Sequence, residues 1–292
     1  MKDDLGDRMK GNYEDRTRYF LPRRTYTIVR LDGKAFHTYT KGLNKPFDAD
    51  LFADIDAAIE EMLPEIQGAV FAYTQSDEIS ILLSDFATPQ TSAWFDGNLQ
   101  KVGSVASSIM TAEFNKFRYA RYIWDKTDDG RWTVTKGEND KWNFIDECPQ
   151  AYFDARVFTI PDRIEVMNYF IWRNNDCTRN SVSMVAQSMF SHKQLQGKTT
   201  KDMLEMIREA GKDWATNYTE GQKYGRIISR EEYTIPYNPL MPDVNVIKDN
   251  IDGAVVKRSK WSASPAWKFT DNKDKLLAMI PEYSYEAVNK VA

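Results

Sequence analysis

The sequence predicts an α+β protein built on a ferredoxin-like βαββαβ core. Short segments rich in β-branched and aromatic residues alternate with longer segments whose apolar residues recur every three or four positions, which is typical of strands that alternate with helices. Through residue 160 the order is strand, helix, strand, strand, helix, strand, and this is the split βαβ order. The chain of 292 residues, 42% apolar and 28% charged, suits one large globular domain or two small ones.

The first strand and the first helix have clear periodicities. Residues 25–31 form a β-branched and aromatic run that predicts a strand, and this strand ends at Asp32 and Gly33. In residues 49–63, leucine and isoleucine recur at a spacing of four, which predicts a helix.

The remaining core elements are a hairpin, a long helix and a last strand. Residues 69–73 and 79–83 are short apolar runs around the polar segment 74–78, so they predict two strands joined by a tight turn. Valine, alanine and isoleucine recur on one face of 98–120, which predicts a long helix. Residues 153–160 predict the fourth strand.

The rest of the chain is less regular. Residues 124–150 hold three tryptophans among Asp, Gly and Lys and predict an inserted hairpin or loop, and two helices are expected over 162–175 and 178–195. We divide the chain into a catalytic domain with an N-terminal arm, residues 1–195, and a C-terminal extension, residues 196–292, that can pack on the same domain. Nucleotide polymerase palms and nucleotide cyclases share the predicted core topology, so the fold alone does not identify the function.

Composition limits the classes of function. The charged N-terminus predicts no signal peptide, and no apolar run approaches the ~18 residues of a membrane span, so we expect a cytoplasmic protein without a membrane partner. The two cysteines, Cys148 and Cys177, form neither a disulfide framework nor a zinc cluster. The net charge of −4 is unusual for a nucleic-acid binder.

Any RNA must therefore be bound by local basic clusters. Each cluster is equally readable as an ordinary solvated face. The candidates are Arg16, Arg18, Arg23, Arg24, Arg179, Lys257, Arg258 and Lys260.

Two acidic residues stand where predicted strands end. In the split βαβ topology the first and third strands are adjacent and central, so Asp32 and Asp77 can meet at one edge of the sheet. A pair of carboxylates suits a hard cation such as Mg²⁺. Two such ions can activate an attacking oxygen and stabilise a leaving pyrophosphate, which is the chemistry of phosphoryl transfer.

The residues after Asp32 suit a phosphate ligand. Gly33 allows the backbone to approach a phosphate closely, and its carbonyl can ligate a metal. Lys34, Ala35, Phe36 and His37 can wrap a triphosphate with backbone N–H groups and one cation. Ordinary alternatives exist: an Asp-Gly pair usually forms a turn, an acidic hairpin tip is usually solvated, and a lone histidine is more often structural.

Three blocks of the sequence resemble the hallmark blocks of the tRNA-histidine guanylyltransferase family. The first is Arg30 to His37, followed by Lys45-Pro46; the second is Ala72 to Ser80; the third is Trp172 to Asn180. The resemblance is close over residues 25–195. It implies a polymerase-palm-like catalytic domain that adds nucleotides to the 5′ end of a tRNA in the 3′-to-5′ direction, after activation of that end with a nucleoside triphosphate.

The resemblance also implies ligands. Asp32, the Gly33 carbonyl and Asp77 match the residues that hold two Mg²⁺ ions in the family. The stretch from Asp32 to His37, with Ser76 and Asp77, matches the site that binds ATP or GTP.

Two further catalytic candidates follow from the resemblance alone. Lys45 matches a basic residue that handles the triphosphate charge, and Glu78 matches an acid beside a metal ligand. The resemblance further implies a tetramer or another homo-oligomer.

The third block departs from the family pattern. Where eukaryotic members carry His-Ile-Asn-Asn-Leu-Tyr-Asn, this chain has Thr178 to Met184 and retains only Asn180 of that run. This is more similar to bacterial and phage-type members, which tend to repair truncated tRNA 5′ ends by templated addition. An alternative interpretation of the block is a surface ladder of salt bridges along a helix. A nucleotide cyclase or a nucleotide-binding regulatory protein on the same palm is the alternative function.

Overall fold

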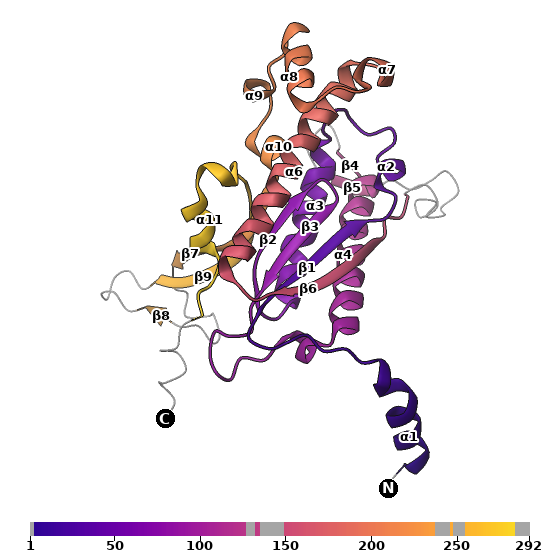
Figure 1. Cartoon of the computed structure of the whole chain (residues 1–292), viewed down its shortest axis with the longest axis vertical. Helices are drawn as coiled ribbons and strands as arrows, with labels where there is room; N and C mark the ends of the chain where they lie inside the picture. Colours follow the sequence, from indigo (N-terminus) through magenta and orange to yellow (C-terminus); the bar gives the residue numbers. More distant parts are fainter. Residues whose placement is uncertain (1–2, 127–131, 135–148, 237–245, 248–254, 284–292) are drawn as a thin grey trace.

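A central antiparallel sheet organises the computed structural model of this chain (Figure 1). The structure describes residues 3–126, 132–134, 149–236, 246–247 and 255–283. The sheet has seven strands in the order β6-β1-β3-β2-β7-β9-β8. The strands are β1 (Tyr26–Gly33), β2 (Ala69–Gln75), β3 (Glu78–Leu83), β6 (Phe153–Ile160), β7 (Arg226–Pro236), β8 (Val246–Ile247) and β9 (Val255–Pro265).

The predicted βαββαβ core is confirmed. Its four strands lie in the order β6-β1-β3-β2, with antiparallel neighbours, and β1 and β3 are adjacent as the split βαβ topology requires. The predicted helices are α3 (Ala49–Met62) and α4 (Leu99–Ile123). The side chain of Asp48 accepts a hydrogen bond from the Leu51 N–H and so caps the start of α3.

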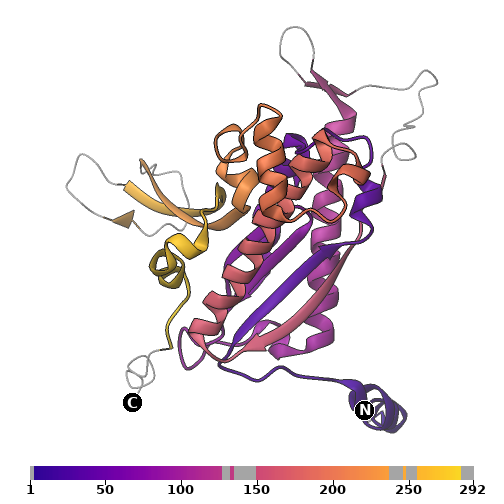
Figure 2. The ribbon, with the colours of Figure 1, turned by 45° about the horizontal axis from the view of Figure 1, so that its top comes forward.

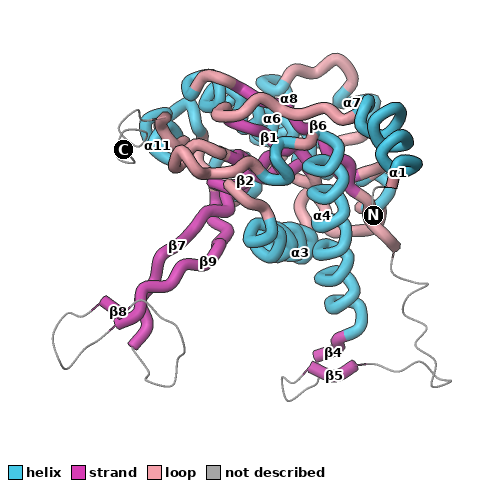
Figure 3. The backbone as a smooth tube through the Cα atoms, turned by 90° about the horizontal axis from the view of Figure 1, so that it is seen from below, coloured by secondary structure: helices cyan, strands magenta, loops and turns pink. Residues whose placement is uncertain are grey.

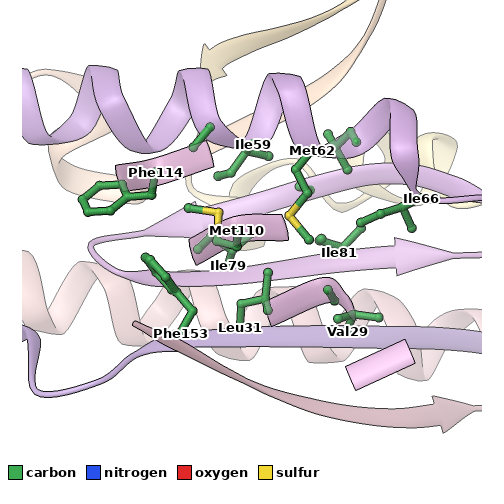
Figure 4. Close-up of a cluster of buried hydrophobic side chains, with 14 of the residues drawn as sticks. Val29, Leu31, Ile59, Met62, Ile66, Ile79, Ile81, Met110, Phe114 and Phe153 are labelled. Atoms are coloured by element: carbon green, nitrogen blue, oxygen red, sulfur yellow. The ribbon is translucent and has the colours of Figure 1, made fainter. Parts of the chain in front are cut away.

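One face of the sheet packs on α3 and α4 (Figure 4). Val29 and Leu31 of β1 and Ile79 and Ile81 of β3 point into this core, where they meet the apolar stripe of α3, including Ile59. The alternate residues of the same strands point to the opposite face. The strand ends that carry acidic residues are therefore held by a close-packed layer.

The opposite face is crossed by a single long helix, α6 (Arg163–Met189), with α11 (Lys273–Met279) beside it. The prediction of two helices over 162–195 was wrong at their junction: α6 continues through the polar third block, and only the short α7 (His192–Leu195) follows. The polar run is satisfied by tertiary contacts and does not end the helix. The Asn174 side chain donates to the Tyr224 carbonyl and accepts from the Phe269 N–H.

The C-terminal region is more regular than predicted. β7 and β9 are 11-residue strands. β7 pairs with β2, so this region extends the core sheet. The outer parts of β7 and β9 project from the body as a ribbon (Figures 2 and 3). Because most side chains in that ribbon are exposed, it lacks the apolar alternation by which strands are usually recognised.

The other described elements are short. A hairpin of β4 (Trp124–Lys126) and β5 (Trp132–Val134) follows α4, as predicted for the insert; Cys148 and the rest of the insert up to residue 148 lie outside the described residues. No residue of α1 (Asp4–Met9) is buried, and this helix stands away from the body (Figure 1). Among the described helices, none has the length and apolar character needed to cross a membrane. The remaining helices are η1 (Lys10–Glu14), η2 (Asp15–Thr17), α2 (Phe36–Tyr39), η3 (Leu63–Glu65), η4 (Trp94–Gly97), α8 (Thr200–Glu209), α9 (Trp214–Asn217), α10 (Glu220–Tyr224) and η5 (Phe269–Asp271).

Candidate active site

The two predicted carboxylates meet at one end of the sheet. Leu31 of β1 pairs with Ile79 of β3, so the next residue of β1, Asp32, lies beside the β2–β3 turn. That turn consists of Ser76 and Asp77 alone, since β2 continues to Gln75 and β3 begins at Glu78. Ser76 adopts a left-handed backbone with φ of 50°, which a tight hairpin turn requires.

Gly33 is required by the close approach of its neighbours. A Cβ atom at this position would lie 2.1 Å from the Phe36 ring and 2.9 Å from the Asp77 Oδ2 atom. The Asp77 carboxylate is therefore packed against the backbone of Gly33. Two carboxylates and a backbone carbonyl are oxygen donors of the kind that Mg²⁺ prefers. Among the described residues, no group of three or more His, Cys, Asp or Glu side chains is arranged to hold a metal ion.

The surroundings of Asp32 and Asp77 disfavour the ionised form of each carboxylate and so raise both pKa values. Burial raises the pKa of Asp77 to about 6, and the negative charges of Asp32 and Glu78 act in the same direction. Burial also raises the pKa of Asp32, with Glu78 adding to the effect and Arg30 and Arg156 opposing it. The Arg156 guanidinium is 3.7 Å from Asp32, which is too long for a hydrogen bond. A bound cation would supply the missing positive charge.

Glu78 has a different environment from the two aspartates. Its carboxylate is buried and accepts hydrogen bonds from Arg173 Nε and Nη2, both at 2.6 Å, and from Arg30 Nη2 at 2.6 Å. The sequence-based assignment treated Glu78 as a catalytic acid beside a metal ligand. Through the two guanidinium groups on its oxygens, Glu78 also ties α6 to the hairpin that carries Asp77.

A cleft of about 550 Å³ opens beside these residues. This volume is in the usual range for small-molecule sites. Its walls come from the carboxylate edge, from the segment around the start of α3, from the second half of α6 and from α10 with the start of β7. The lining residues are Asp32, His37, Phe47, Phe52, Gln75, Ser76, Asp77, Glu78, Cys177, Asn180, Ser181, Ser183, Met184, Gln187, Gly221, Gln222, Gly225 and Arg226.

Comparisons with known proteins identify the family of this chain. A family model described as tRNAHis guanylyltransferase matches residues 6–161, just over half of the 292-residue chain. This chain belongs to the tRNA-histidine guanylyltransferase family. It is thus a member of a family of nucleotidyltransferases.

Individual relatives and structures support the family assignment. The chain is 27% identical to a tRNA(His) guanylyltransferase of Debaryomyces hansenii, over 75% of this chain and 79% of that protein. It is 28% identical to an uncharacterized protein of Acanthamoeba polyphaga mimivirus, over 78% of this chain and 77% of that one. A solved bacterial tRNA(His) guanylyltransferase-like protein in complex with ATP is 35% identical, with a TM-score of 0.75 and coverage of 96% of this chain and 100% of that one. A corresponding complex with GTP is 33% identical, with a TM-score of 0.70, and covers the same shares.

The predicted nucleotide-binding residues from Lys34 to His37 do not all face the cleft. His37 lines the cleft, whereas the Phe36 side chain is buried in the core. The Lys34 N–H donates to the Tyr152 carbonyl at 2.8 Å, so that amide is already used. Lys34 and Ala35 are exposed.

Lys45 also lies outside the cleft wall. Lys45 is exposed and does not line the cleft, although Phe47, two residues later, does. A triphosphate that extends out of the cleft could still meet its ammonium group.

The third block combines both interpretations that its sequence allowed. Arg173, Asp176 and Arg179 form the expected ladder, with N–O distances of 2.9 and 2.8 Å. Arg173 is nevertheless buried, and its closest carboxylate is Glu78. The run that departs from the eukaryotic pattern contributes four residues to the cleft wall: Asn180, Ser181, Ser183 and Met184.

Sequence reasoning missed the residues that come from distant parts of the chain. Arg226 lines the cleft; its Nε donates to Asp56 at 2.6 Å and its guanidinium lies 4.4 Å from the Phe52 ring centroid. Nothing local marks Arg226, because it begins a strand that the sequence did not predict. Arg30 and Arg173 stood inside quoted blocks, but their shared partner Glu78 could not be identified from spacing.

Most of the proposed basic clusters are at least partly neutralised. Arg23 donates to Asp85 at 2.6 Å, and Arg18 to Glu14 at 2.7 Å. In β9, Lys257 pairs with Glu232 and Lys260 with Glu231. These positions are weaker candidates for RNA contacts than their sequence suggested.

Proposed function

We propose that this protein adds nucleotides to the 5′ end of a tRNA in the 3′-to-5′ direction, with Mg²⁺ as the metal and ATP or GTP as substrates. The observation that carries the proposal is the pair of acids at the end of the central strands: Asp32 and Asp77 have raised pKa values and line a cleft of about 550 Å³. One relative is a tRNA(His) guanylyltransferase, which suggests tRNA as the acceptor. Two bacterial structural neighbours were solved in complex with ATP and with GTP, which suggests these nucleotides as the donors.

Different residues of the chain would bind the metal ions and the triphosphate. Asp32, the Gly33 carbonyl and Asp77 would hold the divalent cations, which when bound activate the attacking hydroxyl and stabilise the leaving pyrophosphate. Ser76 and His37 line the cleft beside these acids and are placed to contact the triphosphate.

Charge outside the cleft has a supporting role. We expect Lys45, which is exposed on the loop before α3, to meet the outer phosphates. Glu78 holds Arg30 and Arg173 and so keeps the hairpin at a fixed distance from α6.

We further propose templated repair of truncated 5′ ends as the main activity. Templated addition takes its selectivity from base pairing, so the protein need not read the rest of the tRNA. Addition of an unpaired G to full-length tRNA-histidine lacks that pairing and needs protein contacts. The run from Thr178 to Met184 lacks the family's histidine, and its residues line the cleft where such contacts would be made.

The test is a 5′-extension assay. The protein is incubated with Mg²⁺, ATP and GTP, with a tRNA that lacks its first nucleotide and, in parallel, with full-length tRNA-histidine. We expect higher catalytic efficiency on the truncated tRNA. Efficient addition of G opposite A, with an efficiency ratio at or below one, would contradict templated repair, and formation of a cyclic nucleotide without RNA would favour the cyclase alternative.

The family resemblance also leads us to propose a homo-oligomer, with the tetramer as the expected form. Its mass in solution, measured by light scattering over a range of protein concentrations, tests this. A monomer at micromolar concentration would contradict it.

A further inference from the structure

Part of the sheet face crossed by α6 is left open. α6 starts beside the end of β6 and crosses toward β2 (Figures 1 and 2), so it leaves uncovered the end of β1 and the start of β6. Asp32 lies opposite Asp154, and Arg30 lies opposite Arg156. The side chain of Arg156 is 58% exposed. This open surface leads directly to the carboxylates of the candidate active site.

A large aromatic side chain stands at the border of this surface. Trp172 of α6 is 50% exposed, although most side chains of its size in a folded protein are largely buried. The Arg173 guanidinium carbon lies 4.4 Å from its ring centroid and the Arg30 guanidinium carbon lies 6.0 Å away. The Tyr169 ring packs edge-to-face against the Trp172 ring, with 5.9 Å between the ring centroids. The ring is thus held by three neighbouring side chains while half of the residue's surface is exposed to solvent.

The tryptophan lies close to the acids. Arg30 contacts Trp172 and precedes Asp32 by two residues on the same face of β1. Two residues along a strand span about 6.6 Å. Trp172 therefore lies near the strand end that carries Asp32.

We infer that Trp172 is a stacking platform for the 5′-terminal base of the RNA acceptor stem, with Arg156 beside it for a phosphate. This inference rests on the proposed function and identifies the surface that presents the RNA end. RNA-binding proteins commonly stack terminal or unpaired bases on aromatic side chains. Charge alone would hold RNA weakly on this surface, because Arg156 lies 3.7 Å from Asp32 and Arg173 pairs with Asp176. Stacking does not depend on net charge, which suits a chain whose net charge is −4.

The experiment uses the full-length protein and an RNA hairpin that copies an acceptor stem, with 2-aminopurine as its 5′ nucleotide. Stacking of this base on the ring changes its fluorescence, and titration gives the dissociation constant. Trp172→Leu removes the aromatic face and Trp172→Phe keeps one. The matched control is Phe95→Leu: Phe95 is also an exposed aromatic, at 39%, and stacks on Trp94, which lines a recess with Thr27 at the opposite end of β1.

We expect Trp172→Leu to weaken RNA binding by about tenfold, as for loss of one stacked base, and to abolish the fluorescence change. Trp172→Phe should retain most of both, and Phe95→Leu should behave as wild type. ATP affinity in the absence of RNA, the melting temperature and the mass in solution should be unchanged in Trp172→Leu.

Three results would overturn the inference. One is RNA affinity within twofold of wild type in Trp172→Leu. Another is an equal loss of ATP affinity, which would show a merely structural role next to Arg173. The third is a change of oligomeric mass without a change of RNA affinity, which would show that a second copy of the chain covers the ring. If wild-type protein extends the RNA hairpin in any of these cases, the proposed function stands and only the platform fails; if it neither binds nor extends RNA, the proposed function itself fails.

Discussion

Two groups of acids in this molecule have opposite surroundings. Between α3 and α4, Asp54 is 3% exposed and its carboxylate accepts hydrogen bonds from Arg118 at 2.7 Å and from Arg121 at 2.6 Å. At the end of the sheet, Asp32 and Asp77 lie together with Glu78, and the guanidinium of Arg156 is 3.7 Å from Asp32. The fold thus pairs Asp54 with two guanidinium groups, whereas it holds Asp32 and Asp77 close to a third acid.

Glu78 shows that this difference is local. It is adjacent to Asp77 in the chain, yet it receives two guanidinium groups. Arg30 of β1 and Arg173 of α6 both bind Glu78. The neighbouring Asp77 has a pKa raised to about 6 by burial. Acids that are crowded together beside a cleft and have raised pKa values are candidates for a functional site.

The largest expected effect comes from removing one of the two aspartates at the end of the sheet. Asp32→Asn and Asp77→Asn should each lower the rate of nucleotide transfer by on the order of 10³-fold or more, because the cation site loses a ligand and its charge. Single-turnover rates at saturating Mg²⁺ measure this. Asp154→Asn is the matched control, since Asp154 is exposed and lies opposite Asp32 on β6; it should change the rate by less than about threefold. Near-wild-type turnover in either site variant would refute the assignment.

The next effect concerns stability at the neutralised acids. Asp54→Asn and Glu78→Gln should each lower the free energy of unfolding by roughly 3–5 kcal/mol, because the first change removes the carboxylate that pairs with buried Arg118 and the second removes the carboxylate nearest to buried Arg173. Denaturant titration measures the loss. Glu78→Gln should also slow transfer per folded molecule, since Glu78 positions the hairpin, whereas Asp54→Asn should not. Equal effects of both variants on the rate would remove the distinction between the two sites.

A smaller, pH-dependent effect is expected at Asp77. Its pKa in the folded protein is about 6, above the ordinary value of 3.8 for an aspartate, so the folded state binds the proton more tightly than the unfolded chain does. The stability associated with this proton is fully present below about pH 4 and is lost as the pH rises through 6. Metal-free Asp77→Asn should therefore gain stability relative to wild type between pH 4 and pH 7, by at most about 3 kcal/mol. Melting temperatures across this range test it, and a stability difference that does not vary with pH would contradict it.

The smallest effect is expected at the paired surface cations. Because Arg18, Arg179 and Lys257 each have a carboxylate partner, replacing any one with alanine should weaken tRNA binding by no more than about threefold. Wild-type affinity should still fall as salt increases, through the remaining phosphate contacts. Binding measured at two salt concentrations checks both statements. A tenfold loss for a single variant would show that its cation contacts RNA.

The predictable parts of this protein are those with a local periodicity. The alternation in 25–31 and 79–83 and the spacing of four in 49–63 led to the βαββαβ core, because one face of each element is buried in a continuous apolar layer. The third block was misread as a helix boundary. Its polar side chains are paired with residues far along the chain, and this pairing cannot be recognised from local composition.

The sequence by itself determined the core topology and the positions of Asp32 and Asp77 at strand ends, since the period of two and the turn between two strands are local properties. Only the tertiary structure decided which acids are neutralised. Arg173 reaches Glu78 across 95 residues of sequence and Arg226 reaches Asp56 across 170. The strand that brings Arg226 to the cleft is held by backbone hydrogen bonds to β2. Backbone pairing requires no particular side chains, so a strand whose outer half is exposed leaves no periodic signal in the sequence.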